Sequence, residues 1–257
     1  MLGDLVGKLG REAAQTMLPT LREIYAPNFI IANGENAAAG LGITPDIVKA
    51  LLHSGVDVVT LGNHTWSKNS VVECLEYEPR ILRPANYPSG TPGRGCRIYT
   101  ASDGIRVGVA NLMARTFMEP LDDPFRLADT ILGSFRGQAV VSLFDFHGEA
   151  TSEKMALAYY LNGRASAVIG THTHVQTADE QILSQGTAYL SDVGMVGPQN
   201  SILGMDADGV VKRFVTQMPH RLEVAEGPVV LCGVLVDVDA GTGHATHIER
   251  IQIRDIV

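Results

Sequence analysis

The sequence predicts an α/β protein of one domain, built as a four-layer α/β/β/α sandwich of two mixed sheets. In the first two-thirds of the chain, short apolar, β-branched runs alternate with helical patterns, which is typical of strand–helix–strand units. Further strand-like runs joined by Gly-containing turns follow Met205. The 257 residues are 45% hydrophobic, enough to bury a sizeable core within a single domain spanning 1–257.

The strands are predicted where apolar and β-branched residues form short runs. In the first two-thirds of the chain these runs are 29–32, 56–61, 107–112, 140–144 and 167–170. A hairpin is predicted between 96–100 and 105–111. After Met205 the predicted strands are 213–217, 229–237 and 247–253. This number of strands favours two sheets packed face to face, with helices outside them.

An early helix is indicated by Ala13, Met17 and Leu21, which recur at four-residue spacing. Pro19 lies inside this pattern. Because proline lacks the N–H that a helix interior needs, it should kink this helix or divide it into two segments.

Two later helices are predicted from their end signals. The first has Thr44 as N-cap, Pro45 at its first position and Gly55 as its terminating residue. The second covers 153–162, with Ser152 as its cap.

Charge and cysteine content exclude several protein classes. A formal net charge of -8 and a pI near 5.4 argue against a duplex-binding surface, which needs a Lys/Arg stripe. Cys74, Cys96 and Cys232 form no CxxC spacing, so we expect reduced thiols. No apolar stretch approaches the roughly 20 residues of a membrane-spanning helix. We therefore expect a cytoplasmic protein without membrane partners; self-association stays open.

Metal-ligand side chains occur in five separated segments, each directly behind an apolar run. The segments are Gly3-Asp4, Gly34-Glu35-Asn36, Gly62-Asn63-His64, Phe146-His147 and Gly170-Thr171-His172-Thr173-His174. Loops at the carboxyl ends of strands in an α/β sheet converge on one edge, so these side chains should meet there. Carboxylate, amide and imidazole groups together suit divalent metals.

The prediction of a metal site depends on the whole set of segments and not on any single residue. Asp4 alone would be a solvated turn residue, and Glu35 or Asn36 alone a cap or surface loop residue. The pair His172 and His174 has i, i+2 spacing, which in extended backbone places both imidazoles on one face. In order, and each behind a strand, the five segments predict a metal centre.

The ordered segments resemble the GD, GNH, H and GHxH elements of the calcineurin-like metallophosphoesterase superfamily. Nearly the whole chain is similar to one branch of it, the bacterial YmdB-type phosphodiesterases. The matching blocks are 32–37, 60–66, 147–154 and 170–174. The resemblance implies the metallo-dependent phosphatase fold.

The resemblance also implies a site for two divalent ions, bridged by Glu35. One ion would be held by Asp4, Glu35 and His174, and the second by Glu35, Asn36, Asn63, His147 and His172. Iron or manganese is the occupant that the family suggests. Ligand chemistry alone leaves zinc as an alternative, since nitrogen and oxygen ligands suit all three metals.

The implied reaction is hydrolysis of a small-molecule phosphodiester, with 2′,3′-cyclic nucleotides as the favoured substrates. Two neighbouring metals can generate a bridging hydroxide that attacks phosphorus in line. His64 would then give a proton to the departing oxygen. Two alternatives stay open: a phosphomonoesterase or nucleotidase on the same fold, and a regulatory protein that binds a nucleotide without turnover.

Contacts to the rest of a nucleotide are less evident from the sequence. Arg115, Arg221 and the loop at His220 are the candidate basic groups. Trp66 and Phe117 are candidates to stack on a base, although burial in the core is the commoner place for an aromatic side chain.

The first segment departs from the family pattern in two ways. Val6 stands where many superfamily members have a histidine ligand, so fewer protein ligands are expected there. Only Met1 and Leu2 precede Gly3-Asp4, whereas a central strand normally has about five residues. We therefore expect either that the reading frame begins upstream, or that Asp4 lies on a frayed terminus and holds its metal poorly.

Overall fold

The computed structural model describes residues 1–257 as a mixed α/β protein with several mixed sheets. A six-stranded sheet has the order β5-β6-β7-β8-β10-β9, in which β6, β7, β8 and β10 run parallel. Its strands are β5 (Cys96–Thr100), β6 (Arg106–Met113), β7 (Val141–His147), β8 (Ala167–Thr171), β9 (Gln181–Ile182) and β10 (Ala188–Leu190).

The remaining strands form two hydrogen-bonded groups that meet at the N-terminus of the chain. The four-stranded group contains β1 (Asp4–Leu5), β11 (Met195–Pro198), β12 (Val229–Val238) and β13 (Ala245–Ile256). The three-stranded group contains β2 (Ile31–Asn33), β3 (Val58–Thr60) and β4 (Ile81–Leu82). Leu2 joins them, because it bridges Ala32 on one side and Gly233 on the other.

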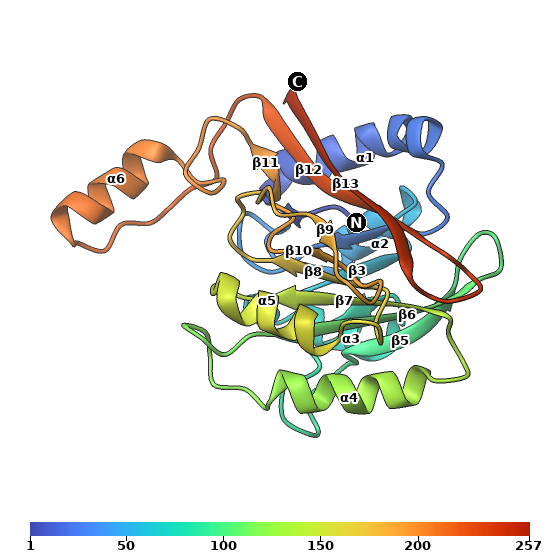
Figure 1. Ribbon diagram of the computed structural model, residues 1–257. Helices are drawn as coiled ribbons and strands as arrows, with labels where there is room; N and C mark the ends of the chain where they lie inside the picture. The colour runs from blue at the N-terminus through green and yellow to red at the C-terminus, as the bar shows by residue number, and fades with distance from the viewer.

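The helices are α1 (Gly7–Tyr25), α2 (Pro45–His53), α3 (Val71–Tyr77), α4 (Pro124–Phe135), α5 (Thr151–Tyr160) and α6 (Ala207–Thr216). Helices α1 to α5 pack on the outer faces of these sheets, whereas α6 stands away from them, as Figure 1 shows. The largest apolar cluster lies between α1, α2, α3 and the β1–β3 side, and the second lies between α4, α5 and the six-stranded sheet. Two smaller clusters fill the space between the sheets. None of the helices is both long and apolar enough to cross a bilayer.

Most predicted strands are confirmed, including the β5–β6 hairpin and the long β12–β13 pair. The predicted strand at 213–217 is wrong, because these residues belong to α6 and its C-cap. Asp206 caps this helix by accepting a hydrogen bond from the Gly209 amide at 2.9 Å. Only Val210 of α6 is buried, so the β-branched residues that suggested a strand lie on a helix that stands away from the body (Figure 1).

Two helix predictions also need correction. Pro19 does not divide the first helix, since α1 continues unbroken from Gly7 to Tyr25. The helix predicted at 153–162 begins earlier, so Ser152 lies inside α5 and Ala150 is the N-cap. Thr44 and Pro45 occupy the predicted N-cap and first position of α2.

Asp4 is not frayed, which overturns that part of the expectation. Its side chain is completely buried, and it pairs in register with Met195 of β11. The amide of Asp4 donates to the Gly194 carbonyl at 3.1 Å. The support therefore comes from β11, a strand that the sequence pattern did not predict.

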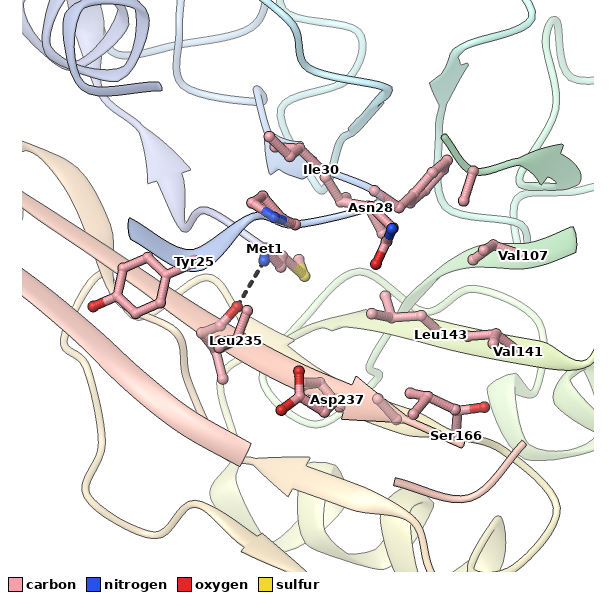
Figure 2. Close-up of a pocket in the computed structure, with 18 of the residues that line it drawn as sticks. Met1, Tyr25, Asn28, Ile30, Val107, Val141, Leu143, Ser166, Leu235 and Asp237 are labelled. Carbon is pink, nitrogen blue, oxygen red and sulfur yellow. Dashed lines mark hydrogen bonds between the residues drawn. The ribbon is translucent and has the colours of Figure 1, made fainter. Parts of the chain in front are cut away.

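An apolar cavity of about 240 Å³ lies between the start of β2 and the middle of β12 (Figure 2). Ile30, Val107 and Leu143 are among the residues that line it, and 21 of its 26 lining residues are hydrophobic. It lies at the beginning of the parallel strands and contains none of the predicted metal ligands. Because few polar groups converge there, it is not the candidate site of chemistry.

Candidate metal centre

The predicted ligands gather at the carboxyl ends of five strands. Asp4 lies in β1, Glu35 and Asn36 follow β2, Asn63 and His64 follow β3, His147 ends β7, and His172 and His174 follow β8. Because β7 and β8 are parallel neighbours, with His147 in register with Thr171, their last residues reach the same edge.

Glu35, His147 and His172 form a compact group, which we call the Glu35 cluster. Their ligand atoms all lie within 4.8 Å of one another. His147 Nε2 is 3.1 Å from Glu35 Oε1 and 3.1 Å from His172 Nδ1. Asn63 Oδ1 approaches the same His147 nitrogen at 3.0 Å. Three possible ligand atoms, one each from Glu35, His172 and Asn63, thus surround His147 Nε2.

A second, wider group contains Asp4 and His174, which we call the Asp4 pair. Asp4 Oδ1 lies 3.8 Å from His174 Nε2, and Asn36 Nδ2 lies 2.9 Å from the same nitrogen. Asn36 also donates to Glu35 Oε1 at 3.2 Å, so it lies between the two groups. The other His174 nitrogen, Nδ1, contacts the Leu203 carbonyl at 2.9 Å.

The orientation of His147 is set by a buried relay on its far side. Thr171 Oγ1 donates its proton to Asp145 Oδ1 at 2.7 Å. The His147 Nδ1 atom, 2.9 Å from the same hydroxyl, must therefore be the donor in that contact. Asn33 Nδ2 holds the second Asp145 oxygen at 3.3 Å. Consequently Nε2 is the nitrogen that His147 presents to Glu35.

The loop after β8 does not have the extended backbone that the His-x-His spacing suggested. His172 has φ 105° and His174 has φ 64°, both in the left-handed region. Such strained residues persist where the surroundings over-determine them, often at functional sites. Thus the two imidazoles reach separate groups from a bent loop.

A buried ion pair supports this bent loop from behind. Asp192 Oδ2 accepts from the Thr173 amide at 2.9 Å and from Lys154 Nζ at 2.8 Å. Both side chains of the pair are almost completely buried. Asp192 also accepts from the Gly194 amide at 2.9 Å through Oδ1. The ion pair thereby fixes the peptide between the two predicted histidine ligands, His172 and His174.

Gly62 allows the close approach of the β3 loop to the Glu35 cluster. A Cβ atom at this position would collide with the His147 imidazole and the Glu35 carboxylate. A glycine is therefore required sterically, although its φ is not in the left-handed region.

His64 lies at the partly exposed edge of the centre. Its backbone amide donates to Glu35 Oε2 at 3.0 Å, which fixes the loop to the Glu35 cluster. Asn63 Nδ2 lies 3.3 Å from His64 Nε2. The His64 side chain can therefore meet solvent or a bound molecule while its backbone stays anchored.

Burial and the charges of neighbouring groups shift the pKa values of the side chains in the Glu35 cluster. Burial alone would raise the pKa of Glu35, but the charge and hydrogen bond of His147 outweigh it and lower this pKa to about 2. For His147, burial is outweighed by Glu35, which raises the pKa to about 9. Burial, with the neighbouring His147, lowers the pKa of His172 to about 3. A cation bound at His147 Nε2 must replace a proton there.

Buried negative charge predominates around the centre. Asp4, Glu35, Asp145 and Asp192 are buried carboxylates, whereas Lys154 is the one buried lysine. Burial raises the pKa of Asp4 to about 7, and it also raises that of Asp145. Asp4 Oδ1 is buried with no hydrogen-bond partner. A divalent cation would satisfy this oxygen and offset the charge, so the residues fit a metal centre.

Several residues outside the predicted ligand set support the centre. Asp145 precedes the predicted ligand His147 by two residues on the same strand, so strand periodicity would have placed both on one face. Glu149 lies 3.3 Å from His172 Nε2. Lys154 and Asp192 are separated by 38 residues and carry no local signal of their pairing.

The residues predicted to contact the nucleotide lie in different parts of the chain and differ in exposure. Arg115 lies on the loop after β6 and forms an ion pair with Asp123 at 3.6 Å. Arg221 and His220 lie on the exposed segment that follows α6. Trp66 is partly buried, whereas Phe117 is 88% exposed, contrary to the common burial of aromatic side chains.

Known proteins with similar sequences span nearly the whole chain. The family model described as "YmdB-like protein" matches residues 1–251. A curated relative from Bacillus subtilis (strain 168), named 2′,3′-cyclic-nucleotide 2′-phosphodiesterase, is 50% identical over 99% of this chain and 96% of its own length. A putative phosphatase/phosphodiesterase of Mycoplasma genitalium is 33% identical over 98% of this chain and 91% of its own length.

Solved structures with the same arrangement include two proteins of clear sequence similarity. A hypothetical protein from Thermus thermophilus has a TM-score of 0.92 and 41% identity, covering 99% of this chain and 98% of its own. A phosphatase from Mycoplasma pneumoniae has a TM-score of 0.93 and 30% identity, covering 99% and 92%. With the ligand segments in order and the family match over 1–251, the chain belongs to the YmdB-like family.

Proposed function

We propose that this protein is a metal-dependent phosphodiesterase that hydrolyses 2′,3′-cyclic nucleotides. The observation that carries the proposal is the convergence of Glu35, His147 and His172 within 4.8 Å, beside a buried Asp4 oxygen that has no hydrogen-bond partner. The 50% identity to the Bacillus subtilis phosphodiesterase supports the substrate class. The retained ligand segments favour a catalyst over a relative that has lost its chemistry.

The metal ligands are proposed as the sequence resemblance assigns them: Asp4, Glu35 and His174 for one ion, and Glu35, Asn36, Asn63, His147 and His172 for the other. The contacts of Asn36 with Glu35 and His174 suit a position between the two ions. Iron or manganese is the proposed metal. When bound, such ions supply an activated water and neutralise phosphoryl oxygens.

The protein's own residues orient these groups and move the proton of the leaving oxygen. Asp145 and Thr171 hold His147 with Nε2 toward the centre. Asn63 contacts His147 on one side and His64 on the other, so it couples the position of His64 to the Glu35 cluster. His64 then donates its proton to the ribose oxygen that departs from phosphorus.

We further propose that the two sheets and their outer helices form the four-layer α/β/β/α metallo-dependent phosphatase fold. The clusters outside and between the sheets support this arrangement. A single domain over 1–257, a cytoplasmic location and self-association stay predictions.

The proposal is tested with purified protein, manganese or iron, and 2′,3′-cyclic AMP as substrate. His64→Ala should lower turnover by about 100-fold or more, as expected for loss of a general acid, while metal content stays at the wild-type level. His53→Ala on the exposed end of α2 is the matched histidine control and should keep full activity. Unchanged turnover in His64→Ala would refute the proton-donor role.

A phosphomonoesterase is the second candidate, because the Mycoplasma pneumoniae structure is described as a phosphatase. Comparing rates on 2′,3′-cyclic AMP and on adenosine 2′-monophosphate separates the two activities. Faster release of phosphate from the monoester would favour the second candidate. Tight nucleotide binding without product in a single turnover would indicate a regulatory protein.

A further inference from the structure

Phe117 presents an aromatic ring to solvent in a backbone conformation that a bulky residue rarely adopts. Its side chain is 88% exposed and its φ is 60°. Exposure of an aromatic ring on this scale forgoes the free energy of burial, and a left-handed backbone adds strain. Both features need a reason, and strained residues concentrate at functional sites.

Several of the other residues with positive φ lie at the candidate metal centre. Among the non-glycine residues with positive φ are His172 and His174, together with Leu203, whose carbonyl contacts His174. Phe117 is the one aromatic residue with positive φ apart from these histidines. Other exposed aromatics, such as Tyr77 on α3, show no such conformation.

The chain places Phe117 at the edge of the centre. Met113 is in register with His147, and the Ala114 amide donates to the His147 carbonyl at 2.9 Å. Phe117 follows Ala114 by three residues, a distance of at most roughly 10 Å along an extended chain. The loop that carries Phe117 therefore starts beside His147, on the side of the sheet edge where the candidate ligands gather.

The Phe117 turn is held firmly in place. Glu153 accepts hydrogen bonds from the Arg115 amide at 3.0 Å and from the Thr116 amide at 2.7 Å. The Met118 amide closes the turn on the Arg115 carbonyl at 3.2 Å, and its side chain packs against the second apolar cluster. The backbone that carries the ring is thus fixed, which lowers the entropy cost of ordering this loop on binding.

We propose that Phe117 is a stacking platform for the base of the nucleotide bound at the metal centre. This inference rests on the proposed cyclic-nucleotide substrate. Every nucleobase has a π-face, so a phenyl ring accepts purines and pyrimidines, and aromatic stacking contributes substantially to binding of single nucleotides. The platform provides affinity for the base and leaves the phosphate to the metal centre.

The test compares 2′,3′-cyclic AMP with ribose 2′,3′-cyclic phosphate, which lacks the base. Phe117→Ala should raise the KM for the nucleotide roughly tenfold, within the range that loss of one stacking contact gives. In the same variant, the KM for the base-free substrate should change less than twofold. Phe117→Tyr, which keeps an aromatic ring, should keep the wild-type KM for the nucleotide. Tyr77→Ala, the matched exposed aromatic on α3, should leave both substrates unaffected.

Two further measurements separate the possible failures. Turnover of neither cyclic phosphate by the wild-type protein would refute the proposed function, and calorimetry of adenosine 2′-monophosphate would then still test the platform. Equal affinity of wild type and Phe117→Ala for that nucleotide, or equal KM changes for both substrates, would overturn the stacking role. A change in molecular mass in Phe117→Ala without a change in nucleotide affinity would assign the ring to self-association instead.

Discussion

The two halves of the candidate metal centre are supported in different ways. The Glu35 cluster has interatomic distances near 3.1 Å, and a buried carboxylate holds its central histidine through Thr171. The Asp4 pair is wider, at 3.8 Å, and its histidine is held by the carbonyl of Leu203. In the Glu35 cluster the central histidine ends a strand and is oriented by a buried carboxylate, whereas the histidine of the Asp4 pair lies on a loop.

This difference suggests that the two ions would bind with unequal affinity. Outer contacts that orient a ligand strengthen metal binding, and His147 has the more rigid set of such contacts. Asp4 is firmly placed by β11, so the weaker part of its pair is His174 rather than the carboxylate. The Glu35 cluster should therefore fill first in a titration with manganese.

The largest effect is expected from Glu35→Gln, because Glu35 contacts His147 directly and reaches His174 of the other half through Asn36. Replacing the carboxylate removes the one anionic ligand proposed for both ions, and turnover should fall by more than about 100-fold, beyond the losses typical of outer-shell changes. Metal analysis and turnover are measured together. Glu23→Gln on the exposed side of α1 is the control, and retention of two metals in Glu35→Gln would contradict the bridging role.

A smaller effect, confined to the Glu35 cluster, is expected from Asp145→Asn. The substitution keeps the size of the side chain but removes the charge that orients Thr171 and His147. Manganese affinity of the tighter site should fall about 10- to 100-fold, as measured by calorimetry. The exposed Asp129→Asn is the matched control. Equal weakening of both sites would show that the two halves do not have separate supports.

The convergence of the candidate ligands was predictable because their sequence signals are local. Each follows an apolar strand directly, and strands such as β7 and β8 were found from composition alone. Position within the sheet could not be predicted in the same way. Asp4 looked frayed because its support is β11, and the buried run 195–198 gave no recognisable period.

The misassigned segment shows how local preference can be overridden. The run 213–217 suggested a strand, since its residues Phe214, Val215 and Thr216 are aromatic or β-branched and favour extended backbone. The Asp206 cap and the left-handed C-cap at Gln217 instead close a helix around them. Asp206 precedes the predicted strand by seven residues, so the composition of the run itself carries no signal of this cap.

The smallest effect on metal binding, less than about tenfold, is expected from Lys154→Met, because Lys154 acts only through Asp192 and the Thr173 amide. Its effect on stability should nevertheless be large. Loss of the ammonium leaves Asp192 as an unpaired buried charge, and the free energy of unfolding should fall by about 3–5 kcal/mol. Denaturant unfolding of the metal-free protein measures this change.

The matched control is Arg164→Met, which breaks the exposed ion pair with Asp129 and should cost about 0–1 kcal/mol. The double variant Lys154→Met/Asp192→Asn should be more stable than Lys154→Met alone, since no buried charge is left unpaired. Additive losses in the double variant would mean that the two side chains contribute independently. In that case the conformation of the loop carrying His172 and His174 would be determined by the loop's own backbone contacts rather than by the ion pair.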